Sequence, residues 1–70
     1  MANRPYPSFL IYIDNRGEFR WKLQASNTKV IADSGEGYKS LGDCEHGISL
    51  VQQSGDYPIW EEEQVAKRRR

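Results

Sequence analysis

Cys44 and His46 are the side chains that most readily suggest catalysis, as a nucleophile and its base. Both fall in a stretch expected to be helical, where residues two apart point roughly 160° away from each other. They cannot form a dyad within one chain. We therefore expect Cys44 in the core and His46 in solvent, and we expect no catalytic residues and no enzymatic activity.

Metal binding is the next chemistry to consider, because Asp43, Glu45 and His46 supply oxygen and nitrogen ligands. No second cluster with ligand spacing accompanies them. Cys44 is the only cysteine, which excludes a cysteine-based zinc cage. We expect no metal site and no cofactor.

The loop from Ser34 to Ser40 lies between a strand-like run and a helix and ends in Lys-Ser, like a phosphate-binding loop. A true P-loop has four residues between its glycines and a parallel setting, whereas only Glu36 separates Gly35 from Gly37. The favoured interpretation is that the glycines bend the backbone and the serine caps the helix. The alternative is an anion site at the helix start, formed by Gly37, Lys39 and Ser40.

A mixed aromatic and cationic face is the remaining candidate site. Its members are predicted to share the sheet face opposite the helix: Tyr12, Arg20, Lys22 and Gln24. Such a face can stack bases and hold phosphates, and the basic run Lys67–Arg70 could add phosphate contacts, although Glu61–Glu63 offset it. The simpler interpretation is a solvent-facing antiparallel sheet with cross-strand pairs and a solvated tail.

Three strands are predicted to carry these residues. Alternation of apolar and polar side chains indicates strands over Phe9–Asp14 and Phe19–Ala25, and a β-branched run indicates a third over Val30–Ser34. Gly17 can adopt the left-handed conformation that closes a short hairpin between the first two. Ser26–Lys29 forms the second turn. The result is a three-stranded antiparallel meander.

A single helix should follow the meander. Ser40 is suited to cap its N-terminus, with Asp43 in the first turn, and the helix should extend to about Gln53. Gly47 allows its backbone to approach the sheet closely. One apolar stripe defines the core-facing side: Leu41, Cys44, Ile48 and Val51. The predicted fold class is α+β, with the helix on one face of the sheet.

Length and charge limit the function. A chain of 70 residues forms one domain, and a domain this small removes only about 60% of its unfolded surface from water. One cysteine permits no internal disulfide, so oligomerisation is the expected source of further stability. Ten basic and ten acidic residues leave no net charge to attract nucleic acid or membrane.

No targeting segment is apparent. The first residues, Met1–Pro5, precede no apolar run of signal length, and no stretch approaches 18 apolar residues. We expect a cytoplasmic protein without membrane contact.

The chain resembles the YegP-like family of small bacterial domains of unknown function. The resemblance covers roughly residues 8 to 53 and rests on these elements in order: Phe9–Tyr12, Gly17–Leu23, Ala25, Asn27, Val30–Ala32, Ser34–Ser40, Cys44 and Ile48. It implies a β-β-β-α-β unit, either repeated in tandem or as a single copy that dimerises by exchanging its C-terminal strand. This chain holds one copy, at residues 8–60, between an extension at 1–7 and a charged, flexible tail at 61–70. It departs from the family at Asn27-Thr28, where Asn-Gly is usual, so the type of that turn stays open.

The segment Tyr57–Trp60 is expected to make the dimer contact, through Tyr57, Pro58, Ile59 and Trp60. Pro58 suits the start or edge of a strand, and Ile59 and Trp60 favour a partly buried pleated surface. The partner is therefore a second copy of the chain. Two hypotheses for function remain: a non-catalytic homodimeric accessory or interaction module, or a weak, sequence-tolerant nucleic-acid binder that uses Arg20, Lys22 and the basic tail.

Overall fold

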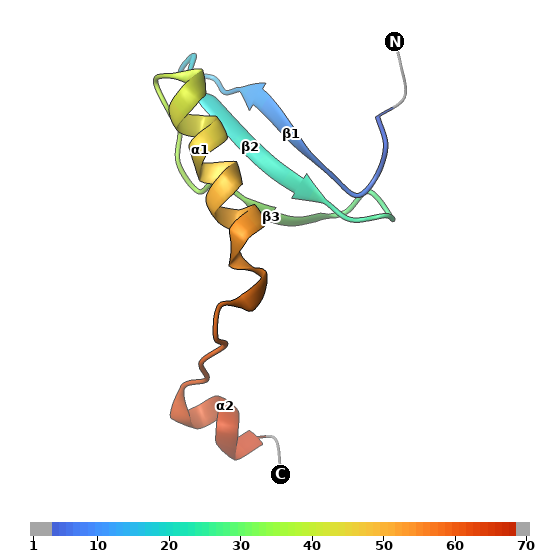
Figure 1. Cartoon of the computed structure of the whole chain (residues 1–70), viewed down its shortest axis with the longest axis vertical. Coiled ribbons are helices and arrows are strands. Elements are labelled where there is room, and N and C mark those ends of the chain that lie inside the picture. Colours follow the sequence, from blue (N-terminus) through green and yellow to red (C-terminus); the bar gives the residue numbers. More distant parts are fainter. Residues whose placement is uncertain (1–3, 69–70) are drawn as a thin grey trace.

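The computed structural model describes residues 4–68, and it has the α+β architecture expected from the sequence (Figure 1). Residues 1–3 and 69–70, which include the start examined for a leader and the end of the basic run, lie outside the described residues. The elements follow in the order β1 (Ser8–Ile13), β2 (Phe19–Gln24), β3 (Val30–Asp33), α1 (Leu41–Gln52), a 3-10 turn η1 (Gln53–Asp56) and α2 (Glu63–Arg68). The strands form one antiparallel sheet in the order β1-β2-β3, which confirms the meander.

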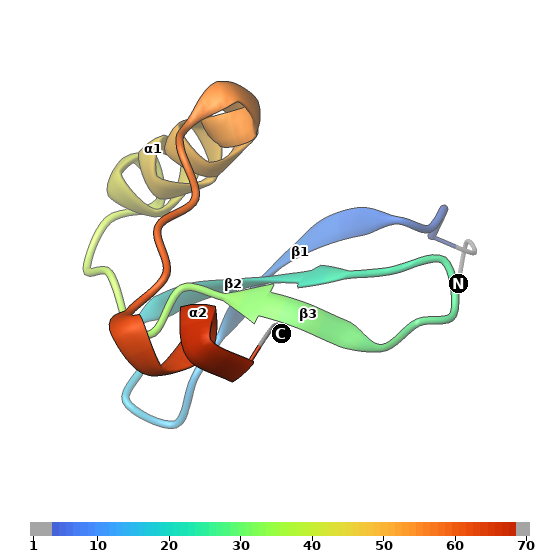
Figure 2. The ribbon, with the colours of Figure 1, turned by 90° about the horizontal axis from the view of Figure 1, so that it is seen from below.

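Strand register separates the two faces of the sheet. Ile11 lies opposite Trp21 and Phe9 opposite Leu23, so the large apolar side chains share one face. The ring of Phe9 meets the indole of Trp21 edge-on, with 5.6 Å between centroids. Helix α1 lies over this face (Figure 2), whereas α2 lies at the far end of the molecule, away from the sheet (Figure 1). The alternation of apolar and polar residues in the sequence predicted both the apolar face under the helix and the polar face opposite it.

The core is small and centres on Trp21 and Cys44. Their exposed fractions are 5% and 0%. Gly47 brings the backbone of α1 close to this pair, as expected, because a Cβ there would lie 3.2 Å from Nε1 of Trp21. Leu41, predicted to belong to the same stripe, is 44% exposed, so that part of the prediction is wrong. It is the first residue of α1, at the end of the helix, and so is only partly covered.

The strand-to-helix bend depends on two glycines for different reasons. Gly35 has a φ of 72°, in the left-handed region. Gly37 has no such angle, but a Cβ there would lie 2.8 Å from Cβ of Glu18. Backbone bonds of 2.7 and 2.8 Å between Phe19 and Tyr38 tie the bend to β2. Ser40 then caps α1 by accepting a hydrogen bond from the Asp43 amide at 3.1 Å, as predicted.

The two hairpin turns also contain left-handed residues. Gly17 has a φ of 79°, in keeping with its expected role in the first turn. In the second turn the left-handed residue is Thr28, with a φ of 68°. This residue occupies the position where the resemblance placed a glycine. A β-branched side chain is poorly suited to this region, so the turn is strained.

Beyond η1 the chain leaves the sheet and helix (Figure 1). The residues from 57 to 62 belong to no helix or strand in the single chain. Ile59 is 93% exposed and Trp60 is 88% exposed. The tail, which was expected to be flexible, contains α2, in which Lys67 pairs with Glu63 at 3.2 Å.

Candidate functional site

An ion pair organises the first hairpin on the face without a helix. Nε of Arg20 donates to Oδ2 of Asp14 at 2.7 Å. The other carboxylate oxygen of Asp14 accepts the backbone amides of Arg16 and Glu18, at 2.9 and 3.0 Å. The hydrogen bond from Arg20, followed by that from the Glu18 amide, holds the pKa of Asp14 below its ordinary value.

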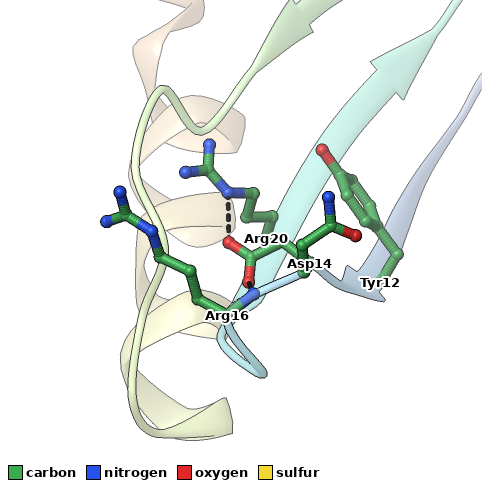
Figure 3. A pocket seen from close by; sticks show the side chains of 5 residues that line it. Tyr12, Asp14, Arg16 and Arg20 are labelled. Atoms are coloured by element: carbon green, nitrogen blue, oxygen red, sulfur yellow. Dashed lines mark hydrogen bonds and ion pairs between the residues drawn. The ribbon is translucent and has the colours of Figure 1, made fainter.

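A shallow depression surrounds this ion pair, lined by Tyr12, Asp14, Asn15, Arg16 and Arg20 (Figure 3). The guanidinium groups of Arg16 and Arg20 lie on the same side of Asp14, and the ring of Tyr12 lies on the other side. Asp14, Asn15 and Arg16 were not predicted from the sequence to belong to this site. In the sequence, only their position in the turn after the strand that contains Tyr12 could have indicated that they belong to the site.

The four residues predicted for the mixed face do lie on one face. Tyr12 pairs with Arg20 across the strands, and Nζ of Lys22 lies 5.6 Å from the centroid of the Tyr12 ring. Gln24 is already engaged, because it donates to the Thr28 carbonyl at 2.6 Å and accepts from Arg4. With Arg20 held by Asp14, Lys22 and Tyr12 are the members that remain most available to a ligand.

Arg4 is a further cation on this side that the sequence pattern did not reveal. Besides its bond to Gln24, its guanidinium lies 4.7 Å from the centroid of the Tyr6 ring. Arg4 precedes the first predicted strand by several residues, so no periodic pattern related it to the sheet.

At the start of α1, few groups of the predicted anion site are free to bind an anion. The Ser40 hydroxyl accepts the Asp43 amide, and the position a Cβ would take at Gly37 lies 3.1 Å from a carboxylate oxygen of Asp14. A carboxylate this close to Gly37 disfavours a second anion. Lys39 is exposed.

Cys44 and His46 are separated as expected, with the thiol buried and the imidazole exposed. Burial, followed by the charge of Glu45, raises the pKa of the Cys44 thiol, which makes it a poor nucleophile. Among residues 4–68, no three His, Cys, Asp or Glu side chains come together to hold a metal ion. No helix in this described part is long and apolar enough to cross a membrane.

The segment Tyr57–Trp60 is the most prominent apolar surface that remains uncovered in the single chain. Tyr57, Ile59 and Trp60 are 59%, 93% and 88% exposed. Large apolar side chains exposed together, in a chain whose sheet has open edges, are typical of a protein-binding segment.

The architecture defines the class of protein. It is a small α+β domain in which a single helix covers one face of a three-stranded antiparallel meander. Residues 14–58 match the family described as a domain of unknown function, DUF1508. The chain therefore belongs to that family, and this confirms the resemblance to the small YegP-like domains.

Similar proteins occur in distant organisms. A UPF0339 protein of Neisseria meningitidis serogroup B is 49% identical over 43 residues, which span 61% of this chain and 75% of that protein. One from Methanosarcina acetivorans is 41% identical over 46 residues, or 66% of this chain and 78% of the relative. The solution NMR structure of a protein from Haloferax volcanii covers 77% of this chain and 92% of that one, with 34% identity and a TM-score of 0.71. These similarities support the fold and name no activity.

Proposed function

We propose that this protein is a non-catalytic, homodimeric interaction module, in which each chain's segment Tyr57–Trp60 adds to the sheet of the other copy. The observation that carries the proposal is the exposure of Ile59 and Trp60, at 93% and 88% in the single chain. Burying one side chain of this type stabilises a protein by about 1.5–3 kcal/mol. Two-fold symmetry would repeat the gain.

The small core supports the same proposal. Only Trp21 and Cys44 are buried apolar residues in the described chain, and Ile13, Val30 and Ile31 remain at least half exposed on the edge strands. A domain of this size usually needs a disulfide, a metal or a partner subunit, and its one cysteine is unpaired.

Sedimentation velocity of the intact chain at micromolar concentration tests the proposal. We expect twice the mass of one chain. Deletion from Tyr57 onward should yield an unfolded or aggregating chain, because the partner's contribution to the sheet is lost. A compact, stable monomer formed by the intact chain would refute the proposal.

Weak nucleic-acid binding is the second candidate, and the contact between Lys22 and the Tyr12 ring favours it. Affinity for single-stranded oligonucleotides should then fall steeply with added salt. Lys22→Gln should weaken that binding, whereas Lys39→Gln, at the start of the helix, should not. Binding that is absent or independent of salt would exclude this function.

A further inference from the structure

The turn between β1 and β2 holds the carboxylate of Asp14 in one position. This carboxylate accepts Nε of Arg20 at 2.7 Å, and the backbone amides of Arg16 and Glu18 at 2.9 and 3.0 Å. The Asp14 side chain is only 14% exposed, and its backbone carbonyl accepts the Gly17 amide at 3.0 Å. Hydrogen bonds that converge in this way lock a side chain in one conformation. Asp14 is therefore a rigid anchor for the cation bonded to it.

Asp14 engages only one of the donors of Arg20. A guanidinium has five N–H groups, of which Nε carries one and the two terminal nitrogens carry four. Within residues 4–68, the bond from Nε is the only hydrogen bond that the Arg20 side chain makes. The side chain is 31% exposed, and neither terminal nitrogen is a buried atom without a partner. Asp14 thus orients Arg20 and leaves its terminal donors accessible to a ligand.

Arg16 brings a second guanidinium to the same depression. Its side chain is exposed and makes no hydrogen bond or ion pair in the part of the chain that the structure describes. Both guanidinium groups extend to the same side of Asp14, with their terminal nitrogens directed away from the carboxylate (Figure 3). Two arginines against one aspartate give the lining a net charge of +1. Glu18, the other acidic residue of this turn, lies beside Gly37 and does not line the depression.

An aromatic side chain lies at the other end of the depression. Tyr12 is on the side of Asp14 opposite the two guanidinium groups (Figure 3), and it is 36% exposed. Nζ of Lys22 lies 5.6 Å from the centroid of its ring and adds positive charge nearby. Accessible aromatic rings of this kind stack with nucleobases of any sequence. The depression therefore combines an anion-binding end with a stacking end.

We propose that this depression binds a nucleotide, with Arg16 and Arg20 on the phosphate and Tyr12 against the base. Asp14 is a positioning residue, because it holds Arg20 and does not touch the ligand. A phosphate monoester carries a charge of about −1.5 to −2 and three acceptor oxygens. It therefore satisfies two guanidinium groups better than a carboxylate, which has two oxygens and a single charge. The site is complete within one chain, so this inference does not depend on the proposed dimer.

Titration of the intact protein with AMP, followed by the NMR shifts of its amides, tests the site. We expect the largest shifts at Tyr12 and residues 14–17. AMP should bind more tightly than inorganic phosphate or adenosine, because each of these lacks one of the two contacts. Shifts located elsewhere, or AMP binding no tighter than phosphate, would overturn the inference. A glutamate-rich peptide that binds more tightly than AMP would also overturn it and would assign the depression to acidic protein segments.

Three variants test the arginines. Arg16→Gln and Arg20→Gln should each raise the dissociation constant of AMP on the order of tenfold, because hydrogen bonds to a charged group are lost. Lys29→Gln is the matched control, since it removes one cation from the turn after β2, at the opposite end of that strand. It should bind AMP almost like the parent. Equal weakening in all three variants would indicate general charge attraction and overturn the inference.

Asp14→Asn distinguishes positioning from charge. Asparagine keeps an oxygen that can accept the amides of Arg16 and Glu18, but it removes the negative charge that holds Arg20. If net charge alone governed binding, this variant would bind AMP more tightly than the parent. We expect a loss of affinity, because the guanidinium of Arg20 is no longer oriented. Unchanged or tighter binding would overturn the positioning role of Asp14.

A single-stranded oligonucleotide without a terminal phosphate distinguishes a free nucleotide from one within a strand. If Arg16→Gln weakens the binding of both AMP and the oligonucleotide, the depression accepts a nucleotide of either source. If it weakens only AMP, the ligand is a free nucleotide. Both results support the site. Oligonucleotide binding that is lost in Lys22→Gln, with neither ligand affected by Arg16→Gln, would leave nucleic-acid binding intact and overturn this inference.

Discussion

Gly47 of α1 lies against the indole of Trp21 in β2, so that a Cβ at Gly47 would stand 3.2 Å from Nε1 of Trp21 and 3.0 Å from the hydroxyl of Tyr38. Burial, followed by the charge of Glu36, raises the pKa of Tyr38, which keeps this phenol neutral beside the indole. The absence of a side chain on one helix residue thus allows a large aromatic residue to fill the core.

Gly42 supplies a matched control for this contact, because a Cβ there meets no atom within 4 Å. Gly42→Ala should stabilise the protein by up to about 1 kcal/mol through helix propensity. Gly47→Ala should stabilise the protein less than Gly42→Ala does, or destabilise it, because the added methyl group would lie too close to Trp21 and Tyr38. Urea denaturation measures both. Equal gains would show that the helix has room to move away from the sheet.

Trp21→Ala should destabilise the protein by about 3–5 kcal/mol, since it removes the larger of the two buried core residues. That loss is comparable to the whole stability of a domain this small. Thermal melting followed by circular dichroism, at one fixed protein concentration, should show an unfolded or barely folded chain. Leu50→Ala, at a 46% exposed site of α1, is the control for loss of a large apolar side chain outside the core. Parent-like melting of Trp21→Ala would mean that the faces of β2 are assigned the wrong way round.

Gly35 and Gly37 should respond differently to the same pair of substitutions. Gly35→Val should cost at least about 1–2 kcal/mol because of its left-handed φ, and Gly35→Asn should cost less because asparagine tolerates that region. At Gly37 the obstacle is the Glu18 side chain, with its Cβ 2.8 Å away, so asparagine and valine should both destabilise. Unfolding free energies from denaturant titration distinguish the two causes. Valine tolerated at both positions would show that the bend needs neither glycine.

Thr28→Gly should stabilise the protein by up to about 1 kcal/mol. The left-handed conformation costs a non-glycine residue about 1–2 kcal/mol, and the greater freedom of glycine in the unfolded chain offsets part of the relief. Ser26→Gly, in the same turn but outside the left-handed region, serves as the control and should not stabilise. We expect the melting temperature to rise for Thr28→Gly and not for Ser26→Gly. If it does not rise for Thr28→Gly, the left-handed conformation of Thr28 does not strain the turn.

The pair of Asp14 and Arg20 predicts a response to acid. The pKa of Asp14 in the folded chain lies below its ordinary value of 3.8, so the ionised carboxylate stabilises the fold above that pH. This stabilisation is lost as the pH falls through the lower folded value. An NMR titration of the carboxyl carbon should show the lowered pKa, and Arg20→Gln should raise it toward 3.8. Lys22→Gln removes a cation from the same face and should leave the Asp14 titration almost unchanged; an equal response to both variants would exclude a specific role for Arg20.

The amino-acid sequence by itself determined the meander, the face that Trp21 buries, the Ser40 cap and the bend at Gly35. Each of these features follows from local rules, because strand alternation, capping and left-handed glycines depend on residues close together in the chain. Tertiary structure decided the rest. The closeness of Gly37 to Glu18 and the bond between Arg4 and Gln24 arise where distant segments meet. No periodic pattern encodes such meetings, since they depend on the register and packing of the whole sheet.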